Sequence, residues 1–187
     1  KHSDQPGNEH EKLPNLLNRD FHAEQPLQKL VTDVTYIKHH GRFYYLACFI
    51  DLYNREVVDW ELSDTFDNFL IIRPAQRILE KAKSTGRPVL LLHSDQGVQY
   101  SSVGYTSLLK EYNVVQSMSR AGTPRDNAVM ESFFARFKIV LRSHFRYWLR
   151  DDLSAVIAQT IDYFNYVRPL RFLGKKPPVP FRLEQTA

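Results

Sequence analysis

The stretch that decides the fold reads Val89-Leu90-Leu91-Leu92-His93-Ser94-Asp95-Gln96-Gly97-Val98-Gln99-Tyr100. Its four opening apolar residues predict a short strand that is buried on both faces. Asp95 follows where this strand should end, and Gly97 permits a tight turn. Open α/β sheets place their ligand-binding groups at such strand ends. Because Asp-x-Gly is also common turn chemistry, this stretch alone leaves a purely structural turn open as the alternative.

Outward from this strand, the sequence predicts an α/β architecture, a mixed five-stranded sheet flanked by helices. We expect strands over 30–37, 43–50, 56–62, 89–93 and 113–118, the first three as an antiparallel meander. Helices are expected over 67–83, 103–112, 123–145 and 152–166, the third starting with Thr123 as its cap. Residues 1–28 should form an N-terminal arm or linker, 29–168 the folded core, and 169–187 a basic, proline-rich tail without regular structure.

The composition is that of one ordinary globular domain of 187 residues. A single cysteine, Cys48, excludes an internal disulfide framework and fits a reducing cytoplasm. No apolar run approaches the roughly 18 residues of a membrane span, and no signal peptide opens the chain. The first residue is Lys1 and not Met, which suggests a fragment or a processed chain.

The charge is unevenly distributed along the chain. Met118–Ala187 holds 12 Lys and Arg against 6 Asp and Glu, a net of +6, whereas the residues before it hold 13 against 15, a net of −2. A basic C-terminal third indicates a polyanionic partner such as nucleic acid. The alternative is a charged surface that is merely solvated.

Three carboxylates are candidates for a shared site. Asp33 lies in the middle of a predicted strand, where Asp is disfavoured unless something compensates it. Asp95 ends the opening strand, and Glu131 lies beside the aromatic stripe of the third helix. Carboxylates brought together ionise only if a cation lies between them, and oxygen ligands favour Mg²⁺ or Mn²⁺ over Zn²⁺. The alternative is that each acid is separately a turn or surface group.

Four short stretches and one interval carry a family resemblance. Asp95 and Glu131 are separated by 35 residues (131−95−1). The stretches are Thr32-Asp33-Val34-Thr35-Tyr36-Ile37, the segment from His93 to Tyr100, Ser117-Met118-Ser119-Arg120, and Asp126-Asn127-Ala128-Val129-Met130-Glu131-Ser132-Phe133-Phe134. Together they resemble the DDE transposase and retroviral integrase superfamily, and within it the second-frame (OrfB-type) catalytic domain of bacterial insertion-sequence transposases. The resemblance covers about Leu16 to Phe181.

This resemblance implies a ribonuclease H-like fold in which Asp33, Asp95 and Glu131 bind Mg²⁺, with Mn²⁺ as a substitute. It implies cleavage at element ends and strand transfer of a 3′ hydroxyl into DNA, without a covalent enzyme intermediate. The expected partners are transposon ends, target DNA and further copies of the chain on DNA, in the bacterial cytoplasm at the nucleoid and without a membrane. The alternatives are a ribonuclease H-type nuclease that only hydrolyses and a catalytically inactive DNA-binding domain.

Further residues are expected around the acids. Lys138 and Arg142 should share the helical face of Glu131 and contact phosphates, with solvated charge as the alternative. The predicted DNA-binding residues are Lys138, Arg142, Arg146 and Arg168, and the residues expected to support the acids are His93, Ser94 and Asn127. In the tail, Leu170 stands where the family commonly has His, so that any role of this His does not carry over. The family's upstream helix-turn-helix is absent.

Overall fold

The centre of the fold is a mixed five-stranded sheet in the computed structural model, which describes residues 13–185. The strand order is β3-β2-β1-β4-β5. The antiparallel strands are β1 (Lys29–His39), β2 (Arg42–Asp51) and β3 (Val57–Ser63). Parallel to β1 run β4 (Leu91–Ser94) and β5 (Val115–Met118). The predicted meander and mixed sheet are therefore confirmed.

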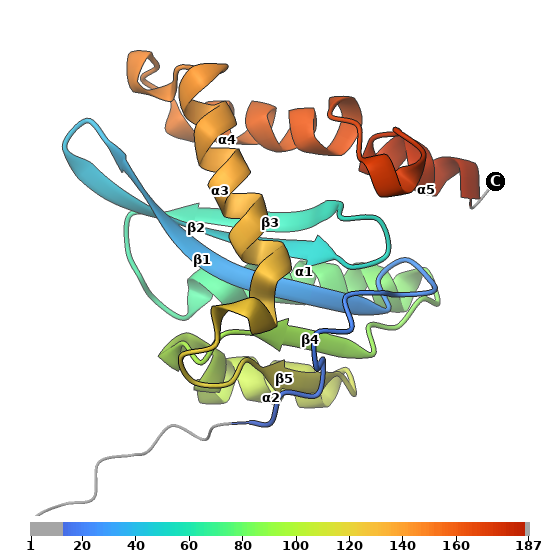
Figure 1. Cartoon of the computed structure of the whole chain (residues 1–187). Helices are drawn as coiled ribbons and strands as arrows, with labels where there is room; N and C mark the ends of the chain where they lie inside the picture. The colour runs from blue at the N-terminus through green and yellow to red at the C-terminus, as the bar shows by residue number, and fades with distance from the viewer. Residues whose placement is uncertain (1–12, 186–187) are drawn as a thin grey trace, which may run out of the picture.

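Helices cover both faces of this sheet (Figure 1). One face packs against α1 (Phe69–Ser84) and α2 (Val103–Glu111), and the other against α3 (Ala128–Ser143) and α4 (Leu153–Asp162). The remaining turns and helices are η1 (Val98–Ser101), η2 (Pro124–Asn127), η3 (Tyr147–Leu149), the π-helical turn η4 (Tyr163–Val167), η5 (Arg171–Leu173) and α5 (Pro178–Gln185). None of the helices within residues 13–185 has the length and apolarity needed to cross a bilayer.

Strand and helix periodicity together generate two cores. Along β1, Val31 and Ile37 point into the core under α3, whereas Leu30 points into the core under α1. The predicted stripe of α3 lies against the core: Met130, Phe133, Phe134, Phe137 and Leu141 are buried, and its remaining member, Val140, is partly buried. The sheet therefore holds α3 in a fixed position above β1.

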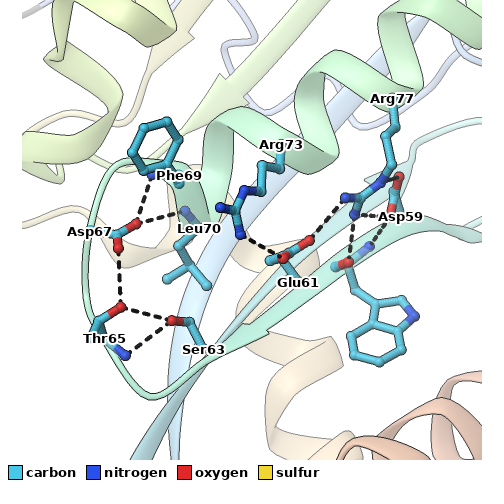
Figure 2. A network of polar contacts seen from close by, with 10 residues as sticks. Asp59, Glu61, Ser63, Thr65, Asp67, Phe69, Leu70, Arg73 and Arg77 are labelled. Carbon is cyan, nitrogen blue, oxygen red and sulfur yellow. Dashed lines mark hydrogen bonds and ion pairs between the residues drawn. The ribbon is translucent and has the colours of Figure 1, made fainter.

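Ion pairs attach α1 to the edge strand β3 (Figure 2). The guanidinium of Arg77 lies 2.8 Å from Asp59 and 3.0 Å from Glu61. At the start of the same helix, Asp67 Oδ1 accepts the main-chain N–H of Phe69 at 2.9 Å. The ion pairs of Arg77 join α1 to a strand 16 and 18 residues earlier in the chain, so no local pattern predicts them.

On the opposite face, η4 closes the outer edge of β3. The side-chain amide of Asn165 donates to the main-chain oxygen of Val57 at 3.0 Å, and its Oδ1 accepts the Val57 N–H at 2.9 Å. Both residues are buried. One amide side chain thus supplies the two hydrogen bonds that a further strand would make here.

The predicted start of the third helix is only partly correct. Residues 124–127 form a 3₁₀ turn, and the Thr123 side chain makes no capping hydrogen bond. Asp126 binds the guanidinium groups of Arg19 and Arg120 instead. The α-helix proper begins after this turn, at Ala128.

The prediction that the tail lacks regular structure is wrong. Pro178 and Pro180 lie in the first turn of α5, where a helix does not need main-chain N–H groups. Arg182 on this helix forms an ion pair with Glu56 at 2.6 Å, and Asn54 donates to the Pro178 oxygen at 2.9 Å. The tail therefore packs against the β2–β3 turn.

The segment before β1 also contacts the body of the protein. Leu17 and Ala23 are buried, and the Ser117 hydroxyl oxygen accepts the Leu16 and Leu17 N–H groups at 2.9 and 3.0 Å. Residues 1–12 of the predicted arm lie outside the described residues. The division of the chain into arm, core and tail stays a prediction.

Candidate active site

The three predicted acids line one pocket. The parallel pairing of β1 with β4 ends at Val31 and His93, and Asp33 and Asp95 each lie two residues further on. Glu131 reaches the same place from the first turn of α3. Asp33, Asp95 and Glu131 border a cavity of about 520 Å³. Asp33 on β1, Asp95 directly after β4 and Glu131 on α3 therefore border one pocket, and their role as a shared site stays a prediction.

The surroundings of Asp33 disfavour the ionised form of its carboxyl group. Burial, together with the nearby charges of Asp95 and Glu131, raises the pKa of the Asp33 carboxyl to about 7. A hydrogen bond of 2.8 Å from the Val34 N–H and the positive charge of Lys138 act in the opposite direction. Because desolvation and like charges both disfavour ionised Asp33, a cation in this pocket would relieve the largest electrostatic costs of the site.

The pocket has an unused acceptor but no closed ligand cluster. Within residues 13–185, no three His, Cys, Asp or Glu side chains lie close enough together to enclose a metal ion. Asn127 lines the pocket and donates to the Thr32 oxygen at 3.1 Å, while its own Oδ1 is buried without a partner. An orphaned buried oxygen costs free energy unless a donor or cation satisfies it.

Gly97 is placed where its main chain lies close to the carboxylate of Asp95. Its φ of −59° is one that any residue adopts. A Cβ at this position, however, would lie 3.0 Å from Asp95 Oδ1, the same oxygen that accepts the Gly97 N–H at 2.9 Å. A side chain here would therefore displace the Asp95 carboxylate.

His93 lies behind the acids and not in the pocket. Its ring nitrogens contact the hydroxyl groups of Ser117 at 2.8 Å and Ser119 at 3.1 Å, and burial lowers its pKa to about 4. A neutral imidazole thus connects β4 to β5, so the role of His93 in this structure is that of a structural partner at the end of β4. Ser94 donates to the main-chain oxygen of Asp95 at 2.8 Å. It therefore supports Asp95 by a hydrogen bond to its main chain.

The predicted basic residues fall into two groups. Lys138 lies on α3 beside Asp33, and its ammonium group is 4.8 Å from the centre of the Tyr36 ring. Arg142, in the last turn of the same helix, is exposed, and so is Arg146 beyond it. Arg168 lies elsewhere, in a second cavity of about 290 Å³ that does not include the three acids.

Sequence reasoning missed the side chains that hold the rim of the pocket. Asp126 is completely buried, and its carboxylate accepts hydrogen bonds of 2.8 Å from both Arg19 and Arg120. These arginines hold the pKa of Asp126 well below its usual range. The three residues tie the N-terminal segment to the loop that precedes Asn127 and Glu131. The sequence signals were that Arg120 and Asp126 belong to two of the stretches that carry the family resemblance, and that Asp126 is an acid near the predicted helix start.

Comparison with known proteins places this geometry in a family. Two models described as "Integrase core domain" match residues 23–124 and 112–178. Over 90% of the chain it is 37% identical to the putative transposase InsK of insertion sequence element IS150 from Escherichia coli, covering 59% of that protein. An uncharacterized transposase-like protein of Haemophilus influenzae is 38% identical over 91% of the chain, with 77% of its own length covered. The transposase of IS904 from Lactococcus lactis is 35% identical.

Solved structures agree on the fold. An intasome of simian T-cell lymphotropic virus in complex with PP2A regulatory subunit B56 gamma contains a chain that matches with a TM-score of 0.70, at 15% identity, covering 91% of this chain and 57% of that one. The HTLV-2 integrase catalytic core domain, solved in complex with magnesium, matches with a TM-score of 0.66 at 16% identity, over 85% of this chain and 98% of that one. The predicted ribonuclease H-like fold is thereby confirmed, and the chain belongs to the integrase core domain family.

Proposed function

We propose that this chain is the part of a transposase that cleaves element ends and transfers the freed 3′ hydroxyl into a second DNA, with Asp33, Asp95 and Glu131 as its catalytic carboxylates. The observation that carries the proposal is the convergence of these three acids, from two adjacent strands and a helix, on one pocket of an integrase-type fold. Transposase relatives covering most of the chain support the reaction class.

The residues of the pocket fit a divalent cation. The donors are oxygen atoms only, as Mg²⁺ prefers and Mn²⁺ tolerates. The raised pKa of Asp33 and the orphaned Oδ1 of Asn127 are the electrostatic costs that a cation or its bound water would offset. Asp33, Asp95 and Glu131 would hold the metal, which supplies activation of the attacking oxygen and stabilisation of the leaving oxygen.

The surrounding residues position DNA. Lys138 and Arg142 extend the face of Glu131 along α3 and are proposed to contact phosphates. Arg146 and Arg168 are proposed to contact DNA further from the acids. Ser94 is not the nucleophile, because its hydroxyl group donates to the main chain at Asp95. The related viral structures are an intasome and an integrase core solved as a dimer, so we propose that several copies of this chain assemble on DNA.

The decisive test is Glu131→Gln, assayed with pre-nicked element ends, a target duplex and Mg²⁺. Gln keeps the volume and the helix preference of Glu, and residue 131 is exposed, so the fold should persist. Joining of the pre-nicked ends should be abolished, and so should cleavage when intact ends are supplied. Loss of groups that only support metal ligands already costs about 10–100-fold, and loss of a ligand should cost more. Glu80→Gln is the matched control, since Glu80 is an exposed residue of α1 on the opposite face of the sheet.

The same assay separates the proposal from hydrolysis alone. Water and the 3′ hydroxyl of the pre-nicked end compete as nucleophiles for the target phosphodiester. Joined products demonstrate strand transfer, whereas a nicked target without joining indicates a nuclease. If the folded Glu131→Gln protein joins DNA at the parent rate, the assignment of the three carboxylates fails.

A further inference from the structure

The β1–β2 hairpin exposes two aromatic rings close to the carboxylate pocket. Tyr36 is 60% exposed and Phe43 is 51% exposed, and their ring centres lie 5.8 Å apart in an edge-to-face arrangement. Because β1 pairs with β4 only as far as Val31, no strand covers this part of β1 on that side. In Figure 1 the blue hairpin extends beyond the rest of the sheet. Burying large apolar rings would be favourable, so their joint exposure indicates a surface made for a ligand.

Each ring is accompanied by a lysine. The ammonium group of Lys138 lies 4.8 Å from the centre of the Tyr36 ring, and that of Lys38 lies 5.8 Å from the centre of the Phe43 ring. Neither lysine forms an ion pair with a carboxylate among the described residues. Aromatic faces combined with unneutralised cations are the surface chemistry that binds single-stranded nucleic acid, by base stacking and phosphate contact.

The platform, defined as Tyr36, Phe43, Lys38 and Lys138, is adjacent to the proposed reaction centre. Tyr36 follows Asp33 by three residues of one strand, which span about 10 Å, and because side chains alternate along a strand the two leave β1 on opposite faces. One DNA strand can reach both only around the edge of β1 that no described strand covers beyond Val31. The distance along β1 equals about three stacked nucleotides at 3.4 Å each. Lys138 connects the two places, since its charge also acts on Asp33. A strand whose phosphodiester lay at the acids would therefore bring a nearby base within reach of the rings.

We propose that this platform binds an unpaired nucleotide of the DNA strand a few positions from the phosphodiester at Asp33. An unpaired base is favoured over a paired one because bases inside a duplex already stack on their neighbours and offer no free face. This inference rests on the proposed function, since it assumes that DNA enters the carboxylate pocket.

The test measures DNA binding by the full chain in metal-free buffer, where no cutting can occur. The probes are a duplex with a three-nucleotide single-stranded overhang carrying 2-aminopurine, and a blunt duplex of the same length. The parent protein should bind the overhang DNA more tightly and change the fluorescence of the unpaired 2-aminopurine. Tyr36→Leu should weaken binding of the overhang DNA about 5- to 100-fold, as expected for the loss of one stacked base, and leave the blunt duplex unchanged.

The chain offers a matched control at Phe69. This residue is 58% exposed, and the guanidinium of Arg73 lies 5.4 Å from its ring, so it reproduces the aromatic–cation pair on α1, across the sheet from α3 (Figure 2). Phe69→Leu should leave both affinities unchanged. Tyr36→Phe should retain the preference for the overhang, because stacking needs the ring and not the hydroxyl group.

Three results would overturn the platform. The first is an unchanged overhang preference in Tyr36→Leu, and the second is an equal loss on both duplexes. The third is a loss that follows a change of oligomeric state in light scattering, which would make the surface a contact between copies. If Tyr36→Leu has a lowered melting temperature, the variant Tyr36→Trp tests the platform instead. The tryptophan fluorescence of this variant must change on adding the overhang DNA and must not change on adding the blunt duplex. A parent that joins DNA without overhang preference refutes the platform alone, whereas a parent that never joins DNA refutes the proposed function.

Discussion

Replacing Asn165 by Ala should destabilise the protein more than replacing a polar residue on the surface would. The Asn165 side chain makes two hydrogen bonds to the main chain of Val57, of 2.9 and 3.0 Å, and both residues are buried. Alanine leaves the N–H and the C=O of Val57 without these partners. Each buried unsatisfied group costs about 1–3 kcal/mol, and relaxation recovers part of it, so we expect a loss of about 2–4 kcal/mol.

Urea unfolding followed by tryptophan fluorescence measures this loss, because Trp60 lies on β3 itself. With a slope of about 2 kcal/mol per molar urea, the midpoint should fall by about 1–2 M. Hydrogen exchange should show the Val57 amide losing more protection than the amides of β1. The matched control is Asn68→Ala, since Asn68 precedes α1 without a side-chain capping bond and should cost less than about 0.5 kcal/mol. If both variants lose the same free energy, the pairing with Val57 contributes nothing to stability.

Three further outcomes are expected. Gly97→Ala should slow joining at least about tenfold with little change in melting temperature, because the new Cβ would lie 3.0 Å from Asp95 Oδ1. A joining rate equal to that of the parent would show that this carboxylate has room to move. Lys138→Gln combined with Arg142→Gln should flatten the slope of log DNA affinity against log salt concentration by up to about 2. An unchanged slope would mean that both residues are solvated surface charges that do not contact phosphates. Asp126→Asn should lower the melting temperature at neutral pH. Because the folded protein lowers the pKa of Asp126, the ionised carboxylate stabilises the fold above the unfolded pKa of about 3.9, and this stabilisation is lost as the pH falls further. The difference in melting temperature between variant and parent should therefore shrink in acid. A difference that stays constant with pH would contradict the ion pairs.

The sequence predicts the parts of this fold that depend on local periodicity. Alternation of β-branched and aromatic residues identifies β1, and the stripe from Met130 to Leu141 identifies α3, because each pattern repeats with the geometry of its own element. The candidate acids could be found for a different reason. Asp33 is out of place in a strand, and the 35 residues between Asp95 and Glu131 match an interval of the family that the sequence resembles.

What the sequence does not reveal depends on contacts between distant residues. Asn165 and Val57 are 108 positions apart, and Asp126 and Arg19 are 107 positions apart, so no window of sequence contains either pair. The helix α5 was missed because prolines usually end helices, whereas Pro178 and Pro180 occupy a first turn that tolerates them. The docking of α5 through Arg182 and Glu56 then stabilises a segment that has a weak local preference.

The order in which the chain supplies its parts has a consequence for synthesis. Asp33 lies in the first half of the protein and Asp95 just past its midpoint, whereas Glu131, Lys138 and the buried stripe of α3, which packs over β1 and β2, come later. A chain that stops before α3 can pair its strands, yet it leaves that apolar face uncovered and lacks the third acid. Incomplete chains of this kind therefore expose an apolar sheet face that favours aggregation and proteolysis, and they lack one of the three carboxylates of the proposed site.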